Sequence, residues 1–224
     1  MSVDVTSTFF IHSVDGYEDN VRAIFRDTFL LGSPLNHEID NFDLYEEMSL
    51  DWYLTTGASD SAVVIDASTQ EVVGYVLVCT KSHDYELWLR TQVWRVFRKN
   101  IVHLLTGRMS RVGRQFYWRR FLDAFTVSHT RSDSGIASLA HVHLNIRPTG
   151  RSGAMALALV AHADAVCRRA GVGAWTGEVN GVAGTRVKAM QRVVGEIVDI
   201  KINRTASFFS HQRVNRITVR RVLQ

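Results

Sequence analysis

The segment 140–172 reads as a strand, a tight turn and a long helix, and it limits the possible folds of the chain more than any other segment does. Residues 140–146 have strand character, the turn 147–153 holds one proline and two glycines, and residues from about 152 to 170 are rich in Ala, Leu and Val. A turn of small residues that leads into a helix presents free backbone N–H groups, and the helix dipole favours negative charge there. The segment therefore predicts a site for a phosphate-bearing cofactor.

Length and composition are typical of one packed domain. The chain has 224 residues, of which 46% are hydrophobic and 21% are charged, so we expect a large core and one domain over residues 1–224. The two cysteines, Cys79 and Cys167, each lie in an apolar segment, which predicts two buried thiols in a reducing compartment. The first residues do not read as a signal peptide, and no apolar stretch reaches about 18 residues. We therefore expect a cytoplasmic protein without a transmembrane segment.

Charge is distributed unevenly along the chain. Residues 1–80 contain 14 acidic side chains and two basic ones, whereas residues 81–224 contain 8 acidic and 24 basic side chains. An acidic half beside a basic half favours an anionic ligand on one side, and the acidic half would suit a cationic substrate.

Predicted strands and helices alternate along the chain. Strands are predicted at 5–11, 61–67, 71–80, 140–146, 174–179, 196–203 and 214–222. Helices are predicted at about 15–31, 40–54, 85–105, 111–125, 152–170 and 182–194. Loops are predicted at 128–135 and 204–212, and Gly74 marks either a bulge or a close approach of another backbone.

The turn and the order of elements together resemble the GCN5-related N-acetyltransferase (GNAT) superfamily. The family signature on this turn is Gln/Arg-x-x-Gly-x-Gly/Ala, and RSGAMA matches it at Arg151 and Ala156, with Ala154 in the first Gly place. The preceding strand, AHVHLNI, is similar to that of a bacterial branch with a His-x-His strand before the turn. The resemblance covers nearly the whole chain. It implies an α/β fold with a mixed, mostly antiparallel sheet flanked by helices, and a helical insertion at about 84–125.

The resemblance also implies an enzyme that uses acetyl-CoA to acetylate the amine of a small molecule, for example an amino sugar. The pyrophosphate would lie on the backbone amides of the turn, and the pantetheine arm would run beside strand 140–146. The residues carried over as cofactor-binding are Leu144, Ile146, Arg151, Ser152, Gly153, Ala154, Met155 and Ala156.

His141, His143 and Asn145 lie two residues apart along the predicted strand, so their side chains project from one face. If that face lines the substrate site, either histidine is a candidate general base, and Asn145 is a candidate hydrogen-bonding group for the substrate or the thioester. The alternative is that all three are structural groups packed under a helix. A metal site is not predicted, because no third ligand accompanies the two histidines.

The usual general acid of the superfamily is a tyrosine in the helix before the final hairpin, and Gln191 stands in its place. A glutamine amide cannot act as an acid. Three alternatives follow: another residue protonates the thiolate, the thiolate leaves unassisted, or catalysis is weak or absent. The last would make the protein a non-catalytic acyl-CoA-binding or interaction module.

The insertion at 84–125 is basic and rich in aromatic residues. Residues 81–121 contain ten Lys and Arg but only two acidic residues. These helices are interpreted as packing against the sheet or a second copy in a homodimer, as a wall of the acceptor site, or as a surface for anionic lipid or nucleic acid. Of these alternatives, we do not expect nucleic acid.

Overall fold

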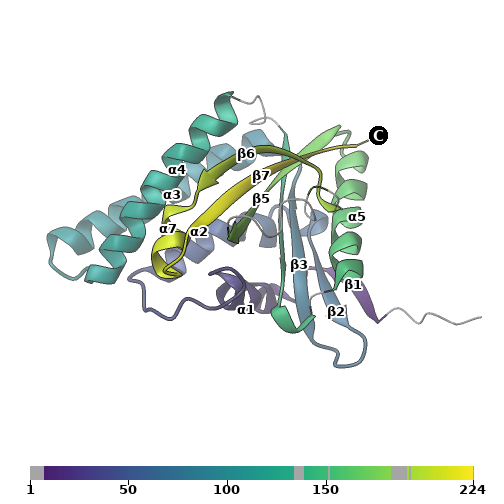
Figure 1. Cartoon of the computed structure of the whole chain (residues 1–224), viewed down its shortest axis with the longest axis horizontal. Coiled ribbons are helices and arrows are strands. Elements are labelled where there is room, and N and C mark those ends of the chain that lie inside the picture. Colours follow the sequence, from purple (N-terminus) through teal and green to yellow (C-terminus); the bar gives the residue numbers. More distant parts are fainter. Residues whose placement is uncertain (1–7, 134–138, 151, 183–190, 192, 224) are drawn as a thin grey trace, which may run out of the picture.

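The structure is a computed structural model that describes residues 8–133, 139–150, 152–182, 191 and 193–223. Its strands are β1 (Phe9–Ser13), β2 (Ala62–Asp66), β3 (Val72–Cys79), β4 (Ala140–Ile146), β5 (Ala174–Val182), β6 (Glu196–Ile202) and β7 (Val214–Val222). They form one sheet in the order β1-β2-β3-β4-β5-β7-β6. Neighbouring strands are antiparallel, except that β4 and β5 are parallel. The predicted mixed, mostly antiparallel sheet is confirmed (Figure 1).

Helices cover both faces of this sheet. They are α1 (Glu18–Thr28), α2 (Phe42–Leu54), α3 (Ser82–Leu105), α4 (Arg111–Asp133), α5 (Gly153–Arg169) and α7 (Arg204–Phe209). The side chains of β3 alternate between two cores: Val76 packs with Leu159 of α5, while Leu77 packs with Ile24 of α1. Both faces of β3 are therefore buried, as the predicted run of β-branched residues requires. The two thiols predicted to be buried, Cys79 and Cys167, are free and buried.

Gly74 occupies a place where β3 and β4 approach closely. A Cβ atom added at Gly74 would lie 2.9 Å from the carbonyl oxygen of Asn145, which is too short for a side chain. The β2–β3 register also shifts opposite this residue, between Val64 and Ile65. Both parts of the prediction for Gly74, a bulge and a close backbone approach, are confirmed.

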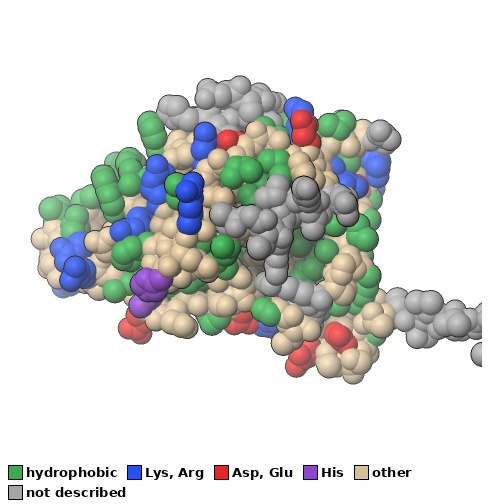
Figure 2. Space-filling view, in the orientation of Figure 1, with side chains coloured by type: hydrophobic (Ala, Val, Ile, Leu, Met, Phe, Trp, Pro, Cys, Tyr) green, Lys and Arg blue, Asp and Glu red, His purple; other side chains and the backbone are tan. Residues whose placement is uncertain are grey.

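Helices α3 and α4 extend away from the sheet on the side opposite α5 (Figure 1). Helix α4 runs to Asp133, so the loop predicted at 128–135 is wrong for residues 128–133. Phe116 is fully buried in a cluster with Tyr45 and Phe209, which attaches α4 to the rest of the fold. Farther out, hydrophobic side chains lie exposed beside Lys and Arg (Figure 2), among them Trp94, at 63% exposure, and Trp118, at 60%.

The segment after β6 forms the short helix α7, although a loop was predicted at 204–212. Asn203 caps this helix by accepting a hydrogen bond from the amide of Ala206 at 2.9 Å. The buried carboxylate of Asp123, on α4, accepts hydrogen bonds from the amides of Arg204 and Thr205 at 2.9 and 3.0 Å. A distant residue thus completes the helix start. The helix predicted at about 182–194 lies mostly outside the described residues.

Candidate active site

Strands β4 and β5 separate halfway along their length. Their parallel ladder ends at the pair Val142 and Gly177. Strand β4 nevertheless continues along β3 to Ile146, and β5 continues along β7 to Val182. Two adjacent strands that keep only their outer partners leave an opening in the sheet, and one edge of β4 borders it.

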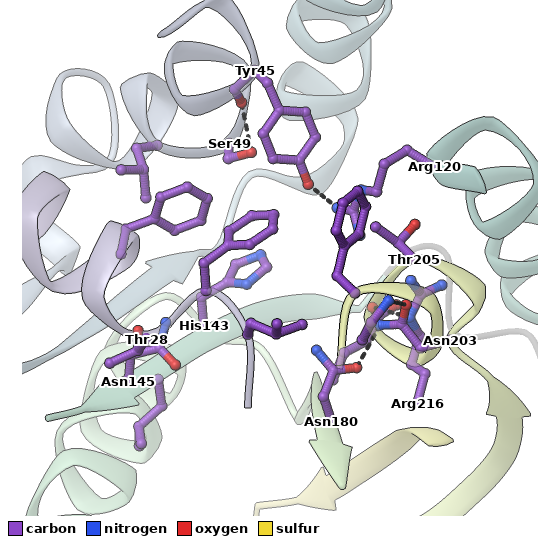
Figure 3. Close-up of a pocket in the computed structure, with 18 of the residues that line it drawn as sticks. Thr28, Tyr45, Ser49, Arg120, His143, Asn145, Asn180, Asn203, Thr205 and Arg216 are labelled. Carbon is purple, nitrogen blue, oxygen red and sulfur yellow. Dashed lines mark hydrogen bonds and ion pairs between the residues drawn. The ribbon is translucent and has the colours of Figure 1, made fainter. Parts of the chain in front are cut away.

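A cavity of about 210 Å³ occupies this opening (Figure 3). Helices α1 and α2 supply one wall, with polar groups from Thr28 and Ser49. Strand β4 supplies His143, Leu144 and Asn145. The opposite wall combines α4, β5, α7 and β7, and its polar side chains are Arg120, Glu178, Asn180, Asn203, Thr205 and Arg216.

The three candidate catalytic residues share the face of β4 that looks toward α1 and α2, but their surroundings differ. His143 is exposed and lines the cavity, with its ring 5.3 Å from that of Tyr53. His141 is buried at 5% exposure, with its ring 4.4 Å from that of Tyr85 on α3. The cavity lining includes His143 and Asn145 but not His141. Of the two histidines, His143 is therefore the one placed to meet a substrate in this cavity.

Asn145 is held in place by a buried tyrosine. Its amide nitrogen donates a hydrogen bond of 2.6 Å to the hydroxyl of Tyr75 on β3. Burial raises the pKa of Tyr75, and the hydrogen bond from Asn145 only partly offsets this, so the phenol stays neutral. This bond fixes the amide of Asn145 at the cavity wall.

The predicted cofactor residues of strand β4 project toward α5. Leu144 packs against the core beneath α5 and also borders the cavity, and Ile146 is buried in the same core. Their backbone lies along the part of β4 beyond its ladder with β5. An extended chain such as a pantetheine arm fits beside such an edge, since a strand edge offers backbone donors and acceptors.

The start of α5 matches the requirements of a phosphate site. Ser152 caps the helix by accepting a hydrogen bond of 3.0 Å from the amide of Met155. Gly153 and Ala154 are exposed, with open space around the Gly153 Cα, and the first turn contains no acidic residue. The first amides of a helix have no acceptor within it and attract anions. Met155 is buried and Ala156 half-buried, so phosphate would meet their backbone; Arg151 lies outside the described residues.

The wall opposite β4 is basic, which sequence analysis did not predict. The guanidinium of Arg216, on β7, forms an ion pair with Glu178, on β5, at 3.3 Å. Arg120, on α4, lies in the same wall and donates a hydrogen bond to the hydroxyl of Tyr45 (Figure 3). No local motif marks Arg120 or Arg216, which lie 96 positions apart and meet only in the folded chain. One interpretation of the insertion is thus supported, because α4 forms part of the cavity wall.

The acidic N-terminal half does not form this wall. Among the described residues before position 81, no Asp or Glu lines the cavity. Glu46 is buried on α2 and forms ion pairs with Arg22 and Arg26, at 3.4 and 2.5 Å. The cationic substrate expected from the charge distribution therefore meets no acidic side chain from the described part of that half in this cavity.

Two further findings concern the described residues only. They contain no group of three His, Cys, Asp or Glu side chains placed to hold a metal ion. None of their helices combines the length and hydropathy needed to cross a membrane.

Gln191, which stands where the superfamily commonly has its acid, is helical and exposed and does not line the cavity.

The fold is similar to that of solved acetyltransferases. The crystal structure of SsHAT aligns over 94% of this chain and 97% of its own, with 14% identity and a TM-score of 0.59. The polyamine N-acetyltransferase of Drosophila melanogaster, which catalyses the formation of N-acetylagmatine, aligns over 96% and 100%, with 14% identity and a TM-score of 0.58. The phosphinothricin acetyltransferase of Sinorhizobium meliloti, solved with acetyl-CoA, aligns over 96% and 89%, with 15% identity and a TM-score of 0.50.

No protein-family model and no curated protein matches the sequence. At identities of 14–15%, the likeness establishes the fold. The chain has the fold of the GNAT superfamily of N-acetyltransferases, as its turn and element order predicted.

Proposed function

We propose that this protein is an N-acetyltransferase that uses acetyl-CoA and acts on a small-molecule amine. The observation that carries the proposal is the separation of β4 and β5 beyond Val142 and Gly177, with a polar cavity in the opening. The GNAT fold supports it, as do the neighbours named for agmatine and phosphinothricin acetylation.

The chain's own groups fit the binding of coenzyme A. The amides of Gly153 and Ala154 at the start of α5 would hold the pyrophosphate, and the free edge of β4 near Leu144 and Ile146 would align the pantetheine arm. When bound, acetyl-CoA supplies the acetyl group as an activated thioester. The protein's task is then to orient the amine and to move its proton.

His143 is the proposed general base. It is exposed in the cavity wall, and a neutral imidazole can accept a proton near neutral pH. Asn145, fixed by Tyr75, would hydrogen-bond to the reacting groups beside it. Gln191 cannot supply a proton, so the proposal requires departure of the thiolate with no acid at that position.

Calorimetry with acetyl-CoA and a thiol-release assay with a panel of small amines test this proposal together. We expect saturable binding of acetyl-CoA and release of free thiol that depends on one class of amine. Binding without thiol release from any amine would favour the non-catalytic acyl-CoA-binding module. Absence of binding would contradict both functions.

Replacing His143 with glutamine should lower kcat/KM about a hundredfold, because removing a general base typically costs that much or more. The affinity for acetyl-CoA, measured by calorimetry, should stay unchanged. His83→Gln is the matched control, since His83 is an exposed histidine on α3 outside the cavity. An unchanged kcat/KM for His143→Gln would exclude His143 as the base.

A further inference from the structure

The ionisable side chains of the cavity wall carry an excess of positive charge. Apart from His143 and the neutral phenols of Tyr45 and Tyr75, they are the two arginines Arg120 and Arg216 and one carboxylate, Glu178. Glu178 lies 3.3 Å from Arg216 and forms an ion pair with it. Arg216 also donates a hydrogen bond to the backbone carbonyl of Asp123 at 3.3 Å. The guanidinium of Arg216 is therefore already bound by acceptors of the protein, and Arg120 is the arginine of this wall that is left to bind a ligand.

The guanidinium of Arg120 has neutral partners. It donates to the hydroxyl of Tyr45 and lies 4.9 Å from the centre of that ring. Within the described part of the chain, no carboxylate comes within ion-pair distance of it. Burial, together with repulsion from Arg216, lowers the pKa of Arg120 to about 10, although the nearby carboxylates of Asp123 and Glu178 act in the opposite direction. The group therefore still carries its charge at neutral pH. A charged guanidinium without a carboxylate partner in a cavity wall is suited to bind an anion.

The amide of Asn180 adds a donor to the same wall. The side-chain oxygen of Asn203 accepts from the amide of Ala206 to cap α7, so its NH₂ group donates to the oxygen of Asn180 at 2.8 Å. That orientation turns the NH₂ group of Asn180 away from Asn203 (Figure 3). The wall thus offers a charged donor on α4 and a neutral donor on β5, while His143 lies across the cavity (Figure 3).

From this arrangement we infer that the acceptor is an amine that also carries an acidic group, a carboxylate or a phosphorus oxyacid. Arg120 binds the acidic group, with Asn180 as a second donor, and this places the amine on the side of His143. The inference rests on the proposed function and narrows its substrate to amino acids and related zwitterions. A polyamine without an acidic group would face Arg120 with like charge.

The test compares matched pairs of amines that differ only in the acidic group, such as an ω-amino acid and its carboxamide. Thiol release gives kcat/KM for both members of a pair, and calorimetry gives their affinities without any need for turnover. We expect both kcat/KM and the affinity to be at least about tenfold higher for the amino acid than for its carboxamide, as charge-assisted pairing with Arg120 predicts. Equal values for acid and amide would overturn the inference.

Two variants assign the preference to Arg120. Arg120→Gln should raise KM for the amino acid about tenfold and leave KM for the carboxamide within about twofold of the original value. The variant would thereby lose the preference for the amino acid over the carboxamide. Arg120→Lys keeps the charge and should restore part of the preference, which a purely structural role would not produce. Equal losses for acid and amide in Arg120→Gln would contradict a binding role. Selective binding of acids without any thiol release would contradict the proposed function while upholding this inference.

Discussion

Replacing Ala154 with glutamate should weaken acetyl-CoA binding by about tenfold or more, without destabilising the fold. Ala154 is exposed in the first turn of α5, where no acidic residue is present. A carboxylate there would repel the pyrophosphate from the amides proposed to bind it. The same carboxylate interacts favourably with the helix dipole, so the free energy of unfolding should stay equal or rise by up to about 1 kcal/mol. Calorimetry and urea denaturation measure the two effects separately.

Ala161→Glu is the matched control for this substitution. Ala161 is an exposed alanine of the same helix, two turns farther along, so the charge change is identical but lies away from the amides. We expect its affinity for acetyl-CoA to stay within about twofold of the original protein, because the effect of the dipole fades beyond the first turn. Equal affinities for the two variants would show that the start of α5 does not bind the pyrophosphate.

Replacing Asp164 with alanine should lower the free energy of unfolding by about 3 kcal/mol. Asp164, on α5, is buried at 5% exposure and accepts a hydrogen bond of 2.8 Å from the indole nitrogen of Trp175, on β5. It also accepts from two nitrogens of Arg221, on β7, both at 2.9 Å. Its loss leaves the buried indole N–H without its acceptor and removes the side-chain contacts that join α5 to β5 and β7 at this position. Urea denaturation should show a lower midpoint with an unchanged slope.

Glu196→Ala provides the control for this stability measurement. Glu196 pairs with Arg220 at 2.7 Å, but its side chain is 62% exposed. An exposed ion pair contributes less than about 1 kcal/mol, so the urea midpoint of this variant should stay close to that of the original protein. A loss of stability as small for Asp164→Ala as for Glu196→Ala would mean that the buried pair contributes no more than a surface one.

Local sequence patterns predicted the centre of the fold. The strand β4 and the helix α5 follow from signals within about 30 residues: strand character, a turn with Pro148 and Gly150, and a run rich in Ala, Leu and Val. The sequence also predicted that His141, His143 and Asn145 share one face, because successive side chains of any strand point to opposite faces. These features depend on neighbours in the chain, which the sequence displays directly.

Helix α7 shows why the local sequence did not predict other features of the fold. Its sequence contains an aromatic pair and no strong helical pattern, and its start is completed by Asp123, 81 positions earlier. A carboxylate that arrives from another helix leaves no trace in the local pattern. Helix α4 likewise continues through residues 128–133, whose polar composition predicted a loop.

The sequence by itself determined the order of the strands, the helix α5 after β4, and the face of β4 that carries the histidines. The tertiary structure alone decided which of those histidines meets the cavity, because Tyr85 of α3 covers His141 while His143 stays exposed. It also decided the charge of the cavity wall. The described acidic residues of the first 80 positions do not line the cavity, whereas Arg120 and Arg216 come together there from distant elements. Periodicity and capping act between neighbours along the chain, whereas burial and charge depend on which distant segments pack together.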